Sequence, residues 1–240
     1  MTEDTIVYKY SFTLEEGETK EIQLCLNKST LDVICPPVPQ EKLPLWTFLE
    51  HKQCPNCPLD PNLHPHCPIA VNILTLAESF SDFVSYERAK VYVETDSRTY
   101  VKETDLQTVL SSILGIYMVT SGCPIMDKLR PMVRFHLPFA SYDETQYRAI
   151  SMYLTAQYLR YKKGKTPDWD LTGFISMYEE IGEVNRAFAG RLRQISPCDA
   201  NTNALVILDS FASLITFEAD INKNIPSELE SIFKLFLDAP

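Results

Sequence analysis

Proline is distributed unevenly along this chain of 240 residues, because nine of the sixteen prolines fall between Pro36 and Pro68. Proline has no backbone N–H and its ring fixes φ, so neither a long helix nor a central strand can run through such a segment. We therefore expect irregular structure there, interrupted at most by a short helix around Leu45–Glu50. The segment separates two parts of the chain that have regular residue patterns.

Strand-like patterns occur on both sides of this proline-rich segment. Apolar and polar residues alternate from Ile6 to Ile34, with a turn at EEGETK, which is typical of a short antiparallel meander with one buried face. Residues 86–103 alternate in the same way and predict a hairpin that turns at Asp96. Between these stretches, Ile69–Val84 has a helical pattern.

From Thr104 onward the sequence predicts helices. Two capping boxes, Thr104 with Gln107 and Ser141 with Glu144, mark helix starts. An apolar stripe at helical spacing extends over residues 171–192. Glycine is scarce, with 7 residues where average usage gives roughly 17, and this scarcity also favours helices over tight hairpins.

The predicted fold class is α+β. Residues 1–103 form an antiparallel β-meander and a hairpin and include a cysteine- and histidine-rich loop at 51–68. Residues 104–240 form a mainly α-helical half. No Gly/Ser-rich linker lies near the boundary, so one continuous domain is the alternative to two separate parts.

The loop at 51–68 contains three of the seven cysteines and three of the four histidines of the chain. They form two pairs, Cys54 with Cys57 and His64 with Cys67, and two residues separate the members of each pair. Such spacing lets a tight turn direct both side chains at one ion, and the second pair completes a tetrahedron. The pattern therefore predicts a structural zinc site with these four ligands.

Other ligand sets and other chemistries also fit this loop. His66 or His51 could take the place of His64, and the distant Cys123 could complete an all-cysteine set. An iron–sulfur cluster or a catalytic metal is an alternative to zinc, and a redox-active Cys54–Cys57 pair is the main rival. Prolines follow that pair directly and argue against the helix that a redox motif needs.

Cys67 is followed by Pro68, and proline is favoured at the first position of a helix. We therefore expect Cys67 to be an N-cap, where the helix dipole would lower the pKa of its thiol and stabilise a metal-binding thiolate. The loop resembles compact zinc knuckles over fourteen residues, and this resemblance implies a metal rather than a nucleic-acid partner.

The segment from Ser121 to Arg148 holds the candidates for catalysis. Cys123 precedes a proline and could be an activated thiol at a helix start, His136 could be its base, and Glu144 and Arg148 lie one helical turn apart. Each also has a structural explanation: core packing for Cys123, the capping box for Glu144 and an i,i+4 ion pair for Glu144 with Arg148. We prefer the structural explanations.

Charge and hydropathy restrict the possible partners. The net charge of −10 repels phosphate backbones, so nucleic-acid binding is disfavoured. The longest apolar run, ILGIYMV at 113–119, is far shorter than the ~20 residues that span a bilayer. The first residues lack the pattern of a signal peptide, and an odd number of cysteines disfavours a disulfide framework. We expect a soluble cytoplasmic protein that binds a protein or a small molecule.

Three stretches taken together, CPNCP…HPHCP, SGCPIMDKLRPMVRFHLPFAS and DANTNALVILDSFA, resemble an uncharacterised bacterial family of a domain of unknown function. The resemblance extends over most of the chain and implies a bacterial origin, and it brings no catalytic residue to this chain. The preferred hypothesis is a binding or regulatory module in which zinc clamps the proline-rich loop. The alternative is an enzyme that uses Cys123 or an open metal position near His136.

Overall fold

Four strands form one antiparallel sheet in the computed structural model, which describes residues 4–15, 17–34, 43–222 and 231–238. The order across the sheet is β2-β1-β3-β4. The strands are β1 (Thr5–Leu14), β2 (Thr19–Asn27), β3 (Arg88–Glu94) and β4 (Thr99–Asp105). The predicted meander and hairpin thus belong to one sheet, in which β1 pairs with both β2 and β3. The third stretch of the meander contributes only the isolated pair of Leu26 with Val33.

The alternating pattern of the strands buries one face of this sheet. Tyr8, Tyr10 and Phe12 of β1 are buried on it, and Val91 and Val93 of β3 continue the same face. The predicted period of two is confirmed, since side chains of a strand point alternately to opposite faces.

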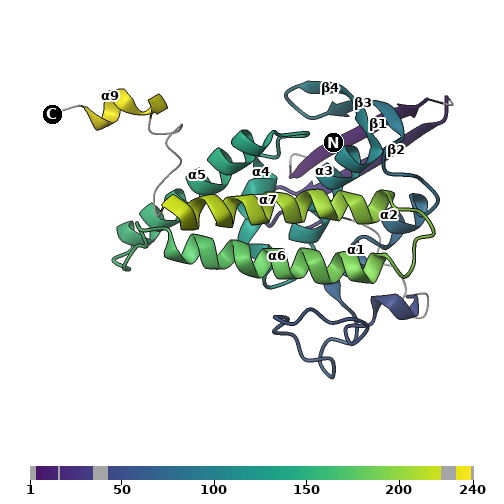
Figure 1. The fold of residues 1–240 in the computed structure, drawn as a ribbon, viewed down its shortest axis with the longest axis horizontal. Coiled ribbons are helices and arrows are strands. Elements are labelled where there is room, and N and C mark those ends of the chain that lie inside the picture. Colours follow the sequence, from purple (N-terminus) through teal and green to yellow (C-terminus); the bar gives the residue numbers. More distant parts are fainter. Residues whose placement is uncertain (1–3, 16, 35–42, 223–230, 239–240) are drawn as a thin grey trace.

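Helices make up the rest of the described fold (Figure 1). They are α1 (Pro68–Asn72), α2 (Leu74–Ser79), α3 (Leu106–Val119), α4 (Arg130–Arg134), α5 (Tyr142–Lys162), α6 (Thr172–Leu192), α7 (Ala200–Asn222) and α9 (Lys234–Leu237), with 3₁₀ turns η2 (Leu45–Thr47) and η3 (Met126–Leu129). The helix α3 is central, because nine of its fourteen residues are buried. It packs against α7, which lies beside α6. The expected α+β class, with a mostly helical second half, is confirmed.

Two local predictions for the helices are wrong and one is confirmed. Ser141 and Glu144 form the predicted capping box at the start of α5. The box predicted at Thr104 is absent: β4 continues to Asp105, which caps α3 by accepting a hydrogen bond from the backbone N–H of Thr108 at 3.0 Å. The single helix predicted for 69–84 is divided at Ile73, and its second part ends at Ser79.

One cluster of buried side chains includes residues of the sheet, of the helices and of the segment between β2 and α1. Leu31, Trp46, Leu49 and Cys67 are the described members of the cluster from that segment. The apolar core therefore anchors both ends of the cysteine- and histidine-rich loop. No helix in the described part of the chain is long and apolar enough to cross a membrane.

Candidate metal centre and adjacent cavity

Residues 43–67, which we call the cysteine loop, lie below α6 in the view of Figure 1. Except for the 3₁₀ turn η2 the loop has no helix or strand, as the prolines predict; the preceding residues 35–42 lie outside the described residues. Its two ends are tied together, because the backbone N–H of Leu49 donates to Pro65 O and that of Cys67 donates to Thr47 O, each at 2.8 Å. Cys54 and Cys57 lie in the part of the loop that these two hydrogen bonds enclose.

Side chains of the loop contact α6 and the residues just after it. Lys52 Nζ donates to Gly190 O, Asn56 Nδ2 donates to Glu180 O, and His51 Nε2 is hydrogen-bonded to Gln194 Oε1, each at 2.9 Å. These contacts are spread along α6, so the helix forms the support on which the loop rests.

Arg191 of α6 makes the most extensive contact with the loop. Its side chain is only 1% exposed, and its two terminal nitrogens donate to four backbone carbonyls of the loop, at 2.9 Å to Trp46 and Phe48 and at 3.2 Å to Leu49 and Lys52. The remaining nitrogen, Nε, is buried without a hydrogen-bond partner among the described residues. A buried cation without an anionic partner is costly.

The charged or ionisable groups that act on Arg191 are thiols, those of Cys67, Cys54 and Cys57. The thiol of Cys123 belongs to the same neighbourhood. Burial, with smaller contributions from Cys67, Cys57 and Cys123, raises the pKa of Cys54 to about 12. Burial likewise raises the pKa of Cys123, with contributions from Cys67 and Cys57. The tertiary structure thus brings the distant Cys123 to the three cysteines of the loop.

Cys67 and Cys123 each lie at the start of a helical turn. Cys67 is the N-cap of α1, as predicted. Burial raises the pKa of both thiols and is the larger effect. The backbone N–H groups of Ala70 and Ile69 act in the opposite direction and lower the pKa of Cys67, and those of Met126 and Ile125 lower the pKa of Cys123. The low pKa expected for the Cys67 thiol at its N-cap position is therefore wrong, and the raised pKa of Cys123 also contradicts the alternative of an activated thiol there.

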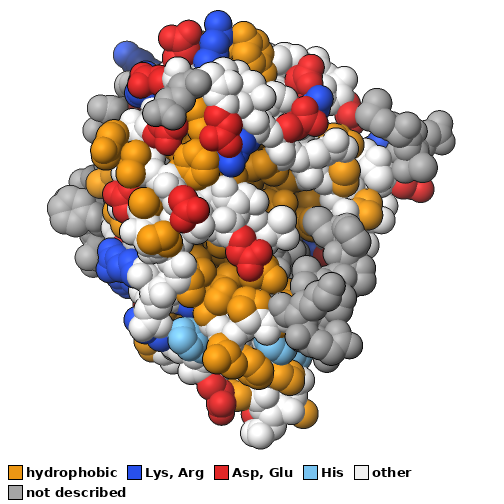
Figure 2. Space-filling model, turned by 90° about the vertical axis from the view of Figure 1, so that its right-hand side faces the viewer, with side chains coloured by type: hydrophobic (Ala, Val, Ile, Leu, Met, Phe, Trp, Pro, Cys, Tyr) orange, Lys and Arg blue, Asp and Glu red, His pale blue; other side chains and the backbone are white. Residues whose placement is uncertain are grey.

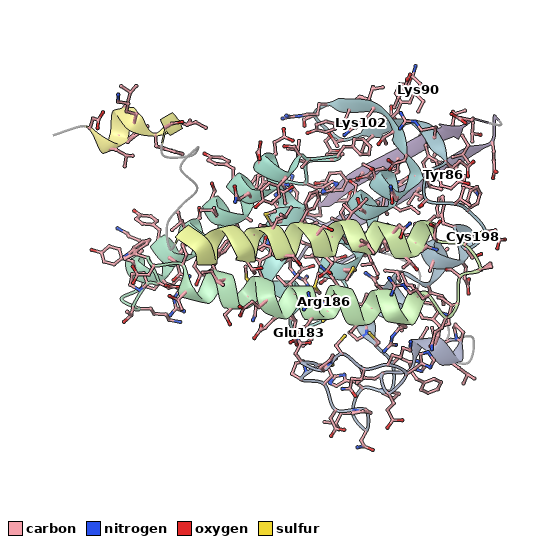
Figure 3. All side chains as sticks on the ribbon, viewed as in Figure 1. Tyr86, Lys90, Lys102, Glu183, Arg186 and Cys198 are labelled. Atoms are coloured by element: carbon pink, nitrogen blue, oxygen red, sulfur yellow. The ribbon has the colours of Figure 1, made fainter. Side chains whose placement is uncertain are left out.

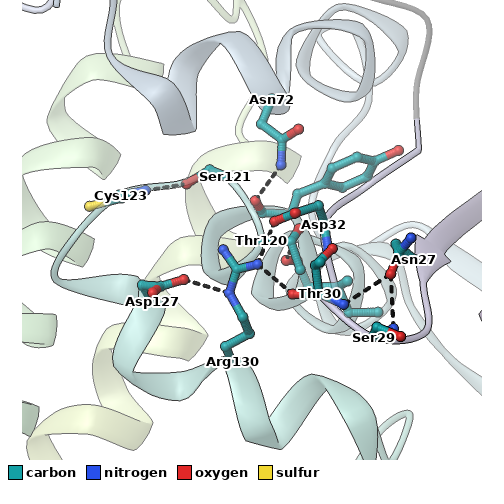
Figure 4. A network of polar contacts seen from close by, with 12 residues as sticks. Asn27, Ser29, Thr30, Asp32, Asn72, Thr120, Ser121, Cys123, Asp127 and Arg130 are labelled. Atoms are coloured by element: carbon teal, nitrogen blue, oxygen red, sulfur yellow. Dashed lines mark hydrogen bonds and ion pairs between the residues drawn. The ribbon is translucent and has the colours of Figure 1, made fainter.

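A network around Arg130 fixes the turn that carries Cys123 (Figure 4). Arg130 pairs with Asp127 in η3 and with Asp32 after β2, and it donates to Thr30 O at 2.7 Å. The Cys123 thiol points away from this network (Figure 4), while its backbone N–H donates to Ser121 Oγ at 3.2 Å.

The three histidines of the loop have other surroundings. His51 contacts Gln194, the Nδ1 atom of His66 is 2.9 Å from Thr47 Oγ1, and the side chain of His64 is exposed. Within the described ranges no three histidine, cysteine or acidic side chains are already arranged to hold a metal ion. Metal binding would therefore require the thiols to turn toward a common centre.

The other candidates for catalysis are not grouped around Cys123. His136 Nε2 lies 2.8 Å from Tyr10 OH and 3.3 Å from Ser112 Oγ. Burial and the nearby Arg148 guanidinium lower the pKa of His136 to about 3, so its imidazole is neutral at pH 7. Glu144 is exposed and belongs to the capping box of α5.

His136 and Arg148 instead line an apolar cavity of about 260 Å³. Side chains of α3, η3, α4, α5, α6 and α7 surround it, and its polar lining includes Ser112, His136, Arg148, Tyr178 and Asn185. His136 and Arg148 were candidates from the sequence, but the cavity was not predicted. Asn185 and Arg191 could be noticed as polar residues on the apolar stripe of residues 171–192, where a buried network and exposure to solvent were both possible.

A second, more polar hollow lies near the turn between α6 and α7, where Tyr86 and Cys198 contribute to its lining (Figure 3). On the face seen in Figure 2, acidic and basic side chains are interspersed among apolar ones. The visible charge distribution is therefore mixed on this face, rather than a basic track of the kind that binds nucleic acid.

These features define an α+β protein with a cysteine-rich loop that rests on a helical half. The chain belongs to the family described as a domain of unknown function (DUF6901), whose family model matches residues 6–234. The expected resemblance to an uncharacterised family is thereby confirmed. Neither the curated proteins nor the solved structures contain a match to the chain.

Proposed function

We propose that this protein is a binding module whose cysteine loop is held against the helical half by a structural zinc ion. The proposed ligands are the thiolates of Cys54, Cys57, Cys67 and Cys123. Cys123 replaces His64 in this set, because the His64 side chain is exposed whereas Cys123 lies among the other thiols. Four protein ligands leave no open position for substrate, which is typical of structural zinc.

The observation that carries the proposal is the charge of Arg191. This guanidinium is buried next to the thiols, and its hydrogen-bond acceptors are neutral backbone carbonyls. Zinc with four thiolates carries a net charge of −2, so Arg191 would compensate part of it. The backbone N–H groups after Cys67 and Cys123, which lower the pKa of these thiols, would stabilise the thiolates further.

Zinc would add a further connection between the loop and the helical half. The loop contributes few residues to the core, and side-chain contacts to α6 hold its middle. Since Cys123 follows α3, a metal on all four thiols would join the loop to the helical half. Such thiols need a reducing compartment, so we also propose a cytoplasmic location. The partner would be a protein or a small molecule rather than nucleic acid.

Elemental analysis and a visible absorption spectrum of protein purified without chelator test the proposal. We expect about one zinc per chain and a colourless sample. Cys57→Ser and Cys123→Ser should lose the zinc and lower the melting temperature, whereas the matched controls Cys25→Ser and Cys198→Ser should keep it. Iron together with visible absorption would indicate an iron–sulfur cluster instead of zinc. The absence of any metal would refute the site.

His64→Ala separates the two ligand sets. We expect it to keep full zinc occupancy, and loss of zinc in His64→Ala with retention in Cys123→Ser would restore His64 as the fourth ligand. Mass-resolved thiol labelling of the native protein tests the enzyme alternative. Cys123 should resist alkylation until the metal is removed or the protein unfolds. Rapid selective labelling of Cys123, slowed by His136→Ala, would favour a thiol-dependent enzyme instead.

A further inference from the structure

The apolar cavity between the helices is separate from the cysteine loop and independent of the proposed zinc site. Its volume of about 260 Å³ is larger than the ~150 Å³ of an engineered apolar cavity that accepts benzene. Scaling from the six carbon atoms of benzene, a ligand of about ten non-hydrogen atoms would fill it. Most of the lining is aliphatic or aromatic, so most of that ligand must be apolar.

Arg148 supplies a cation at the wall of this cavity. One of its terminal nitrogens, Nη2, donates to the backbone carbonyls of Met132 at 3.1 Å and Phe135 at 2.8 Å. No ion pair joins Arg148 to a carboxylate within the described ranges, where the ion pairs involve other residues. The guanidinium can therefore receive a carboxylate on its other N–H groups.

Asn185 of α6 adds a second polar position to the lining. Its side chain is 2% exposed, and its Oδ1 atom is buried without a hydrogen-bond partner among the described residues. A buried acceptor without a donor is unfavourable, and a ligand hydroxyl would satisfy it. His136, which also lines the cavity, contacts Tyr10 and Ser112, so Arg148 provides the cationic contact.

We propose that this cavity binds a small amphipathic carboxylate of about ten non-hydrogen atoms. The carboxylate pairs with Arg148, the hydrocarbon part fills the space between α3, α6 and α7, and a hydroxyl group on the hydrocarbon donates to Asn185 Oδ1. Octanoate, with ten non-hydrogen atoms, is the simplest probe of this class.

Isothermal titration of the full chain with octanoate, octanol and octylamine tests the charge requirement. We expect octanoate to bind at one site and at least about tenfold more tightly than the other two, since a charge-assisted pair is lost in both. Arg148→Gln should weaken octanoate binding by a similar factor, and the control Arg134→Gln, on the exposed part of α4, should not. Equal binding of octanoate and octanol, or no binding of octanoate at millimolar concentration, would overturn the proposal.

A second variant keeps the test decisive if Arg148→Gln does not fold. Gly115 of α3 lines the cavity, and a Cβ atom added there meets only Leu208 at 3.9 Å, an ordinary contact. Gly115→Leu should therefore fill the cavity and abolish octanoate binding without removing a polar group. Unchanged binding in Gly115→Leu would place the ligand elsewhere. A hydroxyoctanoate that binds more tightly than octanoate in the wild type should lose its advantage in Asn185→Leu, and a retained advantage would overturn the assignment of Asn185.

Discussion

The cysteine loop and the helical cavity are each in contact with an arginine that donates to backbone carbonyls, but the two cations have different surroundings. Arg191 donates to four carbonyls of the loop, whereas Arg148 donates to two at the end of α4. The loop has almost no regular secondary structure, so its carbonyls need side-chain donors. Helices satisfy most of their own backbone groups, and this leaves the Arg148 cation available to the cavity. The buried Arg191 cation thus holds the loop in place, whereas the half-buried Arg148 cation is the proposed contact for a ligand.

The largest effect is expected from removing the Arg191 guanidinium, which holds the cysteine loop. Arg191→Met leaves several buried carbonyls without a donor and should lower the free energy of unfolding by about 3–5 kcal/mol. Urea unfolding measures this loss, and limited proteolysis should show earlier cleavage within residues 43–67. Methionine keeps an aliphatic side chain but has neither a charge nor an N–H group. It should therefore not compensate for the lost hydrogen bonds of Arg191.

Arg186 is the matched control, because it lies on the same helix (Figure 3). It pairs with Asp209 at 3.1 Å, and more than half of its side chain is exposed. Arg186→Met should therefore change stability by about 0.5 kcal/mol or less. Comparable losses in the two variants would contradict the special role assigned to Arg191.

An intermediate effect is expected at the cavity, where acid should act through His136. Tyr8 and Tyr10 of β1, Ser112 of α3 and Arg148 of α5 face this imidazole. Its pKa is lowered from 6.5 to about 3 in the folded protein, so between these values the unfolded state binds more protons. Stability is therefore retained above pH 6.5 and falls as the pH is lowered below it, by about 1 kcal/mol per pH unit from this group.

Chemical unfolding of the wild type and of His136→Gln between pH 4 and pH 7 measures this contribution. The variant should be less stable at pH 7 but should lose stability less steeply on acidification. Because acid would also release the proposed zinc from its thiolates, both proteins should be compared after chelation. Parallel pH profiles for the two would show that His136 does not titrate as expected.

The smallest effect is expected at the exposed margin of the loop. Lys52→Ala removes the hydrogen bond from Lys52 Nζ to Gly190 O and should reduce the free energy of unfolding by about 0.5 kcal/mol. Lys52 has a positive φ of 52°, so Lys52→Gly should recover part of that loss by relieving the backbone. Thermal melts of the two variants rank their stabilities. A loss of stability in Lys52→Ala as large as in Arg191→Met would contradict the distinction between buried and exposed hydrogen bonds to the loop.

Local features of this fold could be predicted from the sequence. The alternation in β1, the capping box of Ser141 with Glu144 and the irregular cysteine loop follow from side-chain periodicity, turn chemistry and proline content. The helix start near Thr104 was displaced by one residue, because pairing of β4 with β3 extends the strand to Asp105. At Thr104 the local preference for a helix N-cap is therefore outweighed by the pairing of β4 with β3.

The alternating pattern of the strands and the helical pattern from Thr104 onward were predictable from the order of residues, and so were the α+β class and the short spacing of the loop cysteines. Three other features depend on tertiary contacts: β1 pairs with β3, the loop thiols act electrostatically on Cys123 and Arg191, and Arg148 lines a cavity. The difference lies in how far apart along the chain the interacting residues are. Periodicity and capping depend on neighbours within a few residues, whereas these contacts join residues far apart in the chain and depend on how the packed helices and the sheet bury their apolar faces together.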